Sequence, residues 1–558
     1  MHRVALILLG LLRLINLGYR DLQAWDEGLY AVRTLAVAQY GAWLDQTALS
    51  IWGIYSALHP PLYIWLSALS VELLGNAEFS HRVISVLFGA FTLPVIYSIG
   101  CRLSTDEREG KGIGLIGALL FAINPFVDFY ARQGQFDTVL LFFLAFAVYF
   151  LIRSVEGGSL GWGIAAGVAI GLGLMTKLFV AAGIPLAFAI WIFAARRYSD
   201  GRVWLQLTIS SVVALLIAVP WHAMMVIEHG DGDPLFLLRQ SQMLERFVTG
   251  IEGNTKTLEL FYYVNQLLVL FPLGVAWSLY GLARALRRRK LSAFLLCVWF
   301  LLFFAVFTVM RTKLEFYALP MLAPLALLGG RELVRAMRGE LSRRVLGVLI
   351  GVTSIAVAWS LQQEWRTAIK GVGSFIIKRD AGAAESGVGG VILLGLIGVG
   401  LMLGLVVWMK GLPRGALSRL AVVMFVPALG LSLYNHSIGD RTRWDDGGGQ
   451  VARFIGDGRF SRLVAIGYET NPQLTWYLNG VDVGWRSDMS LQRIDPKGHG
   501  ESLKIWLTDT LRFVPSDALI LIERDRLVRG TKFASDDVMP DGWKKVMETR
   551  RYTLAVRR

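Results

Sequence analysis

Long apolar stretches constrain this chain more than any other feature of its sequence. Runs of about 17 to 25 apolar residues, the length that crosses a hydrocarbon core roughly 30 Å thick, recur from Val4 to Tyr434 and stop after Asn435. Hydrophobic residues make up 54% of the chain and charged residues only 18%, which is too apolar for a set of soluble domains. The sequence therefore predicts a protein that crosses the membrane many times.

The apolar runs predict about thirteen membrane spans. We place them at residues 4–19, 82–101, 113–129, 137–153, 161–176, 178–195, 203–223, 262–283, 291–310, 316–330, 345–361, 390–409 and 417–435. The apolar run 62–75 has only about 14 residues and fits a re-entrant or interfacial helix better than a span. The first segment begins like a signal peptide, but Arg13 interrupts it and no small-residue cleavage site follows, so we expect a retained span.

Basic residues in the short connections predict the orientation of these spans, because Lys and Arg collect in cytoplasmic loops. With the N-terminus inside, the even-numbered connections lie in the cytoplasm and carry Arg102, Arg108, Lys111, Arg153, Arg196, Arg197, Arg202, Arg284, Arg287, Arg288, Arg289, Lys290, Arg331, Arg335, Arg338, Arg343, Arg344, Lys410, Arg414 and Arg419. If 62–75 were a full span, the basic cluster at residues 287–290 would lie outside, so the positive charges argue against that span. The formal net charge of +14 follows from the same bias and indicates no nucleic-acid partner.

The opposite, non-cytoplasmic side receives the longer connections and the C-terminal tail. These connections are 20–81, 130–136, 224–261, 311–315 and 362–389. The tail, residues 436–558, has strand-like runs at Leu463–Gly467 and Ala518–Ile522 and a helix candidate at Glu501–Phe513, which is typical of a small α/β domain. We therefore divide the chain into a membrane domain, residues 1–435 with the first outer loop at 20–81, and an outer α/β domain, residues 436–558. Cys101 and Cys297 lie in apolar stretches and predict no disulfide framework or metal cluster.

Two polar motifs fall in the first outer loop. Asp26 and Glu27 are adjacent carboxylates beside an apolar, membrane-level helix, which suits a proton-accepting role. The alternative is a helix start, with Asp26 as the N-cap and Glu27 in the first turn. His59 precedes two prolines that stiffen the start of the short helix, where a histidine can donate to a phosphate oxygen or shuttle a proton. A plain turn before a helix is the alternative there.

Two further motifs lie at outer junctions of spans. Arg132 is a candidate for bidentate phosphate binding, and Asp137 opens the next span; the alternative is a polar hinge with a structural Arg–Asp pair. Lys313 faces outward against the topology bias, with Tyr317 close by, which indicates an anionic ligand or attraction to lipid headgroups. A similar argument, that of a cation on the outer side against the topology bias, applies to Lys177. All four motifs fall on one membrane face under a topology derived from other residues, so we expect them to act together.

The motifs resemble the integral-membrane glycosyltransferases of the GT-C type. Among these the chain is similar to the dolichyl-phosphate-mannose protein mannosyltransferases and the bacterial lipid A aminoarabinose transferases. The resemblance rests on Asp26-Glu27-Gly28-Leu29-Tyr30-Ala31, His59-Pro60-Pro61-Leu62-Tyr63, Arg82, Ala131-Arg132-Gln133 with Asp137, Met175-Thr176-Lys177 and Thr312-Lys313-Leu314-Glu315-Phe316-Tyr317-Ala318-Leu319-Pro320. It covers most of residues 1–330 and implies an all-α polytopic membrane bundle of about thirteen helices with a C-terminal α/β domain.

Such enzymes transfer a sugar, with inversion, from a polyprenyl-phosphate carrier to an acceptor outside the cytoplasm. The resemblance implies that Asp26, supported by Glu27, is the general base or orients the acceptor hydroxyl. It implies phosphate-binding roles at Arg132, Lys313, Tyr317 and His59, and further site positions at Asp137, Lys177, Arg82 and Tyr63. The implied partners are the lipid-linked sugar, the bilayer and an acceptor lipid, glycan or protein, with no nucleic acid; no cofactor is implied, and a divalent metal stays open.

One departure from the aminoarabinose transferases concerns the residues before the two prolines. Those enzymes carry an acidic-basic pair there, whereas this chain has Leu58-His59, so their phosphate lysine and any metal ligand at that place do not carry over. Two other classes of protein stay open: a transporter or flippase for polyprenyl-linked lipids, and a membrane-anchored ligand-binding protein. A transporter is expected to carry ionisable groups in the middle of several spans, where this chain has almost none. The glycosyltransferase hypothesis requires that Asp26, Arg132 and Lys313 share one cavity at the outer leaflet.

Overall fold

The computed structural model describes two compact units. The described residues are 2–23, 26–50, 53, 58–231, 233, 235–240, 243–250, 259–289, 291–357, 359–360, 448–456, 462–466, 490–494, 518–523, 539, 541–549 and 552–557. Unit 1 consists of Met1–Leu17, Ala57–Tyr63 and Arg82–Thr442, and unit 2 of Gly18–Ser56, Ile64–His81 and Arg443–Arg558. Unit 1 therefore holds most of the predicted spans, and unit 2 joins the first outer loop with the C-terminal segment.

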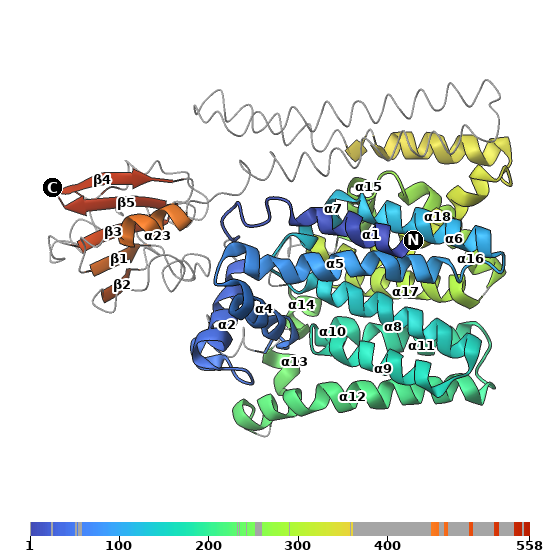
Figure 1. Ribbon diagram of the computed structural model, residues 1–558, viewed down its shortest axis with the longest axis horizontal. Coiled ribbons are helices and arrows are strands. Elements are labelled where there is room, and N and C mark those ends of the chain that lie inside the picture. The colour runs from blue at the N-terminus through green and yellow to red at the C-terminus, as the bar shows by residue number, and fades with distance from the viewer. Residues whose placement is uncertain are drawn as a thin grey trace. The chain divides into compact units, whose positions relative to one another are not determined.

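The secondary-structure elements that the structure describes in unit 1 are all helices (Figure 1). Its helices are α1 (His2–Leu11), η1 (Leu12–Leu14), α5 (Glu78–Gly100), α6 (Glu107–Ala122), α7 (Pro125–Ala131), α8 (Asp137–Gly157), α9 (Leu160–Leu174), α10 (Leu178–Ala181), α11 (Gly183–Ala194), α12 (Gly201–His229), α13 (Phe236–Gln240), α14 (Met243–Val248), α15 (Tyr262–Leu270), α16 (Val275–Arg288), α17 (Leu291–Val309), η3 (Glu315–Ala318) and α18 (Leu319–Met337). Residues 343–357 and 359–360 are also helical. The predicted spans 390–409 and 417–435 lie outside the described residues.

Length and apolar composition single out the helices that can cross a bilayer. Among the described residues, α5, α8, α12 and α17 satisfy both criteria alone, and the bent pairs α6–α7 and α15–α16 raise the number from four to six. Helix α9 and the run Leu178–Ala194 are apolar but shorter. The apolar run 62–75 forms helix α4 (Leu62–Leu74), which with 13 residues is also too short for a straight crossing.

The run 262–283, predicted as one span, is divided into two helices. Helices α15 and α16 are bent by 120° relative to each other. Pro272 lies in the break, where it supplies no backbone N–H and disfavours a helical conformation at Phe271. The predicted span 113–129 is similarly divided into α6 and α7, bent by 69°, with Asn124 capping α7 and Pro125 at its first position. In both cases a proline lies at the break between two helices, although the hydropathy of the whole apolar run predicts one continuous helix.

Glycines allow helices α9 and α12 to pack at close range. Gly163, Gly167 and Gly171 recur every four residues on one face of α9. A Cβ atom added to Gly167 would lie 2.6 Å from Cβ of Val213 and 2.7 Å from the backbone oxygen of Ser210 on α12. Any side chain at that position would have to push the two helices apart, so this spacing of small residues sets their distance.

Unit 2 combines short helices with a five-stranded sheet. Its elements are α2 (Asp26–Tyr40), η2 (Thr47–Leu49), most of α4, α23 (Gly448–Gly456), β1 (Arg462–Ile466), β2 (Ser490–Ile494), β3 (Ala518–Glu523), β4 (Trp543–Glu548) and β5 (Tyr552–Arg557). The strand order is β2-β1-β3-β5-β4; β1 pairs in parallel with β2 and β3, and β5 pairs antiparallel with β3 and β4. Strands β1 and β3 lie at the two predicted strand-like runs, whereas the helix candidate Glu501–Phe513 lies outside the described residues.

Helix α2 and the sheet of unit 2 share one hydrophobic core. Leu22, Ala31 and Leu35, from and just before α2, pack with Val451 and Ile455 of α23 and with Leu519, Leu521, Tyr552 and Leu554 of the sheet. All nine are buried. The first outer loop and the C-terminal segment, more than 400 residues apart in sequence, therefore fold against each other. The backbone N–H of Gly449 also donates to the Asp21 carboxylate, at 3.0 Å.

Candidate functional site

Lys177 is at the centre of a cluster of polar and aromatic side chains in unit 1. It lies between α9 and α10 with an extended backbone (φ −154°, ψ 95°), so the chain breaks its helical path there. Its ammonium lies 3.8 Å from the carboxylate of Asp137, the first residue of α8. It also lies over the rings of Phe136, Phe316 and Tyr317, at 4.7, 4.9 and 5.5 Å from their centroids. Aromatic faces attract a cation and leave its N–H groups able to meet an anion.

The segment around His59 reaches the same cluster. The backbone N–H of Leu62 donates to the Met175 carbonyl at 3.1 Å, which holds the start of α4 against the turn before Lys177. The His59 ring stacks on Phe136, with centroids 6.2 Å apart and an interplanar angle of 23°. Two motifs that are far apart in sequence therefore meet around one phenylalanine.

Tyr317 adds a phenol to this cluster. Its ring stacks on Phe307 with centroids 4.8 Å apart, and its hydroxyl oxygen accepts a hydrogen bond from the Arg246 guanidinium at 3.2 Å. The Arg246 carbonyl in turn accepts from the Thr312 N–H at 3.0 Å. A phenol that accepts from arginine can still donate its own proton, so Tyr317 can serve as a neutral donor to an oxyanion.

The side chain of Arg132 is buried and makes several hydrogen bonds to the backbone. Its guanidinium donates to the carbonyls of Arg13, Ile15 and Asn16, where the first helical segment ends. Arg13 forms a buried ion pair with Asp128 of α7 at 2.8 Å. This arrangement ties the end of the first segment to the α7–α8 junction, and the phosphate-binding role of Arg132 stays a prediction.

Lys313 is likewise surrounded by backbone oxygens. Its ammonium donates to the carbonyls of Phe307, Thr308 and Met310, at the C-terminal end of α17. The side chain is buried, and burial lowers the pKa of Lys313. A cation near a helix C-terminus stabilises the terminal carbonyls and the helix dipole. In this structure Lys313 acts as a cap on α17.

Asp26 and Glu27 begin helix α2 in unit 2. Asp26 is exposed, whereas Glu27 is fully buried and accepts a hydrogen bond from the Gln23 N–H at 2.7 Å. Arg33, on the same helix, is also fully buried. Its guanidinium donates to the Gln46 side chain at 2.8 Å, and burial lowers the pKa of Arg33 to about 10. Glu27 therefore supports the start of the helix and leaves Asp26 as the outward carboxylate. That Asp26 shares a cavity with Arg132 and Lys313 stays a prediction, because Asp26 belongs to unit 2.

The remaining sequence candidates are buried in unit 1. Arg82 is fully buried and donates to the Leu17 carbonyl at 3.0 Å, and Tyr63 is buried at the start of α4. The sequence analysis gave no role to three members of the cluster, Arg246, Phe136 and Phe316, although Phe316 belongs to a motif quoted for the family resemblance. Arg246 lies in the connection 224–261, which the sequence analysis predicts to be outside, so the argument applied to Lys313, a basic residue on the predicted outer side, could have found it. The two phenylalanines are common residues in apolar segments and carry no such signal.

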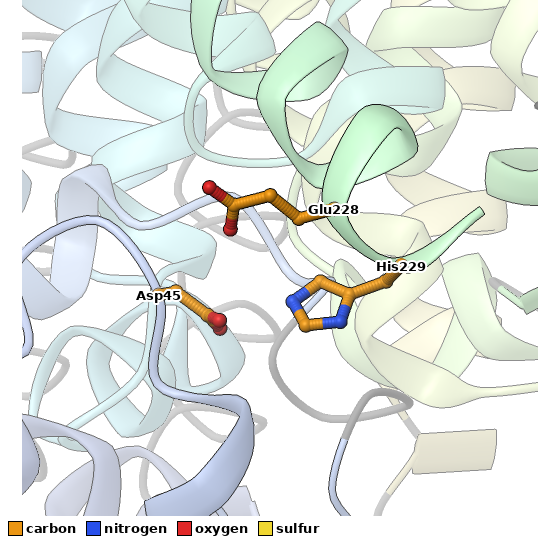
Figure 2. A group of neighbouring side chains, drawn as sticks. All are labelled: Asp45, Glu228 and His229. Atoms are coloured by element: carbon orange, nitrogen blue, oxygen red, sulfur yellow. The ribbon is translucent and has the colours of Figure 1, made fainter. Parts of the chain in front are cut away.

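Glu228 and His229 end helix α12, and Figure 2 shows their side chains at its last turn. A carboxylate and an imidazole are ordinary metal ligands, but a protein metal site usually requires three or more. Asp45, also drawn in Figure 2, belongs to unit 2. Within either unit taken by itself, the described residues contain no group of three His, Cys, Asp or Glu side chains close enough to hold one ion.

Comparisons with known proteins agree with this architecture. A family model described as dolichyl-phosphate-mannose-protein mannosyltransferase matches residues 58–223. The undecaprenyl phosphate-alpha-4-amino-4-deoxy-L-arabinose arabinosyl transferase of Pseudomonas aeruginosa is 27% identical over 452 residues, which cover 78% of this chain and 76% of the relative. A protein of the same description from Pseudomonas fluorescens is 31% identical over 343 residues, 59% of each chain. The crystal structure of ArnT from Cupriavidus metallidurans bound to undecaprenyl phosphate has a TM-score of 0.70 at 18% identity and covers 99% of this chain and 97% of that one.

These matches confirm the resemblance predicted from the sequence motifs: the chain is similar to the GT-C class of integral-membrane glycosyltransferases. Within that class the chain is similar to the arabinosyl transferases of Pseudomonas and to the dolichyl-phosphate-mannose-protein mannosyltransferases.

Proposed function

We propose that the protein is an inverting glycosyltransferase that moves a sugar from a polyprenyl-phosphate carrier to an acceptor on the non-cytoplasmic face of the inner membrane. The acceptor is a lipid, a glycan or a protein of the cell envelope. The proposal places the Lys177 cluster and the outer α/β domain, residues 436–558, on the periplasmic or extracellular side, in a bundle of about thirteen spans.

The observation that carries the proposal is the cluster around Lys177. It brings together four residues that the sequence singles out separately: His59, Asp137, Lys177 and Tyr317. The Lys177 side chain is 22% exposed, and its ammonium lies over aromatic rings and near the Asp137 carboxylate. A point charge beside neutral donors suits the phosphate of a lipid carrier.

We assign donor-phosphate binding first to Lys177 and Tyr317, with Arg246 orienting the phenol. Arg132 and Lys313, to which the resemblance gives this role, instead donate to backbone carbonyls. We therefore propose that both act indirectly: Arg132 holds the α7–α8 junction from which Asp137 projects, and Lys313 holds the end of α17 next to the Tyr317 segment.

The proposed reaction exchanges one bond at the anomeric carbon of the sugar. The acceptor hydroxyl attacks this carbon as its bond to the carrier phosphate breaks, which inverts the configuration. The hydroxyl proton passes to the Asp26 carboxylate, and the bonding electrons stay on the phosphate oxygen. Because Lys177 and Tyr317 stabilise the charge that develops on this leaving group, no second carboxylic acid is required, in contrast to a glycosidase.

The test separates carrier binding from sugar transfer. Undecaprenyl phosphate serves as the binding probe, and undecaprenyl phosphate-4-amino-4-deoxy-L-arabinose, the donor in the relatives' description, serves as the first donor. We expect Lys177→Ala to weaken binding of undecaprenyl phosphate by about 10- to 100-fold, the value of one charge-assisted contact. Lys177→Arg should restore part of the binding. Arg287→Ala, which removes an exposed cation at the end of α16, is the matched control and should bind normally.

Asp26→Asn is expected to behave in the opposite way. It should leave binding of undecaprenyl phosphate unchanged and lower transfer by about 100-fold or more, because the acceptor loses its proton acceptor. Normal carrier binding by Lys177→Ala would reject the phosphate assignment. Normal transfer by Asp26→Asn would reject the base assignment. Wild-type protein that binds the carrier and moves it across vesicles without any sugar transfer would instead favour the transporter.

A further inference from the structure

Unit 1 contains a cavity that lies away from the Lys177 cluster. Its volume is about 1000 Å³, and it is lined where α1, α6 and α17 begin and where α5 and α8 end. Helix α8 connects the two places: Asp137 is its first residue, and Glu156, which lines the cavity, lies in its last turn. A helix of 21 residues is about 30 Å long, so the cavity lies one bilayer thickness from Asp137.

One cation among the charged side chains that line this cavity has no acidic partner among the described residues. Two of the lining bases are paired: Arg102 with Glu156 at 3.0 Å, and Lys111 with Glu107 at 2.5 Å. Arg3 is exposed on the cavity wall and forms no ion pair or hydrogen bond within the described part of the chain. The balance of the lining is therefore positive, with Arg3 available to a bound anion.

Neutral donors surround these charges. The cavity wall includes the hydroxyls of Thr105 and Ser292 and the first turn of α17, from Leu291 to Ala293, whereas the Ser104 hydroxyl donates to the Glu109 carboxylate at 2.6 Å. The first backbone N–H groups of a helix have no partner within it and carry its positive dipole end. Tyr97, which forms a 3.2 Å hydrogen bond with His2, closes one side. Hydroxyls, a helix N-terminus and a guanidinium are the groups that bind phosphate in proteins.

We propose that this cavity binds a phosphate-bearing anion at the membrane face opposite Asp137. The ligand chemistry is a phosphate monoester or diester, carried either by a membrane lipid or by a soluble compound. Basic pockets between membrane helices on the cytoplasmic side are suited to lipid head groups, and the connections that flank this cavity are the Arg- and Lys-rich ones. The proposal does not depend on the sugar-transfer function, because none of the residues around Lys177 lines this cavity.

The test measures binding to the full-length protein in detergent. The probes are dihexanoyl phosphatidylglycerol, glycerol 3-phosphate and, as a zwitterionic comparison, dihexanoyl phosphatidylcholine, each followed by the shift in thermal unfolding temperature. We expect Arg3→Ala to weaken phosphatidylglycerol binding about fivefold, and Arg3→Ala with Lys111→Ala to weaken it further. Both side chains are exposed, so the variants should fold.

Arg108→Ala provides the matched control, since Arg108 is an exposed cation beside Glu107 that does not line the cavity. Unchanged binding by this control supports the proposal. A response to phosphatidylglycerol alone identifies a lipid headgroup, and an equal response to glycerol 3-phosphate identifies a soluble phosphate compound; both support a phosphate site. Equal weakening in Arg108→Ala, full binding in the double variant, or an equal response to phosphatidylcholine overturns it.

Discussion

Three cations on the predicted outer face look alike in sequence and differ in their surroundings. Arg132 and Lys313 each donate to three backbone carbonyls, whereas Lys177 lies over three aromatic rings near one carboxylate. The predicted topology marks Lys313 and Lys177 as unusual, because a cation on the predicted outer side needs a reason. It does not identify the reason, since the acceptors belong to helix ends whose positions depend on the fold.

Lys313→Met is expected to destabilise the protein by about 1–3 kcal/mol, the cost of leaving buried carbonyls of α17 without their donor. Methionine keeps the length of the side chain and suits the buried site, so the change isolates the ammonium. Thermal unfolding in detergent, followed by tryptophan fluorescence, measures the effect. Binding of undecaprenyl phosphate should stay near normal below the unfolding transition.

Arg311→Met removes a neighbouring exposed cation and should leave the unfolding temperature unchanged. If Lys313→Met unfolds like the wild type but no longer binds undecaprenyl phosphate, Lys313 is a phosphate ligand, as the family resemblance implies, and its assignment as a cap on α17 is wrong.

At the level of helices, hydropathy and charge predict where elements lie better than how they bend. Helices α5, α8, α12 and α17 lie at predicted spans, because long apolar runs have one stable form in a bilayer. The 120° bend at Pro272 is visible in the sequence as a proline, but a proline also occurs inside α5, at Pro94, without ending that helix. Whether a proline kinks or ends a helix depends on neighbours that supply the missing hydrogen bond.

Gly167→Leu is expected to separate α9 from α12 and to lower the yield of folded protein at least severalfold. The new Cβ would overlap Val213 and a backbone oxygen of α12, and backbone cannot move aside as a flexible side chain can. Size-exclusion chromatography with fluorescence detection measures the folded fraction. Gly161→Leu is the control, because Gly161 lies on the same helix and a Cβ there meets only the Ser159 hydroxyl at 3.5 Å. Equal yields of the two variants would show that this interface tolerates a side chain.

At the scale of the whole chain, the long-range core of unit 2 is what the sequence reveals least. Hydrophobic patterns mark α2 as a helix and Ala518–Ile522 as strand-like, but nothing local indicates that Leu35 packs with Val451 and Leu554. The division at residue 435 treats the outer loop and the tail separately, whereas the contacts within unit 2 join them. The helix that begins at Asp26 is therefore stabilised by residues from the far end of the chain.

The orientation of the chain in the membrane can be tested with two single cysteines. Ser159 lies between α8 and α9, in a connection that the positive-inside rule places in the cytoplasm; Thr249 follows α14, in the outer connection 224–261. Both are exposed, so either accepts cysteine without disturbing a core. In a background where Cys101 and Cys297 are replaced by alanine, a membrane-impermeant maleimide added to right-side-out vesicles should label Thr249→Cys at once and Ser159→Cys only after permeabilisation. Labelling in the reverse order would place the Lys177 cluster in the cytoplasm, where an acceptor of the cell envelope does not reach it.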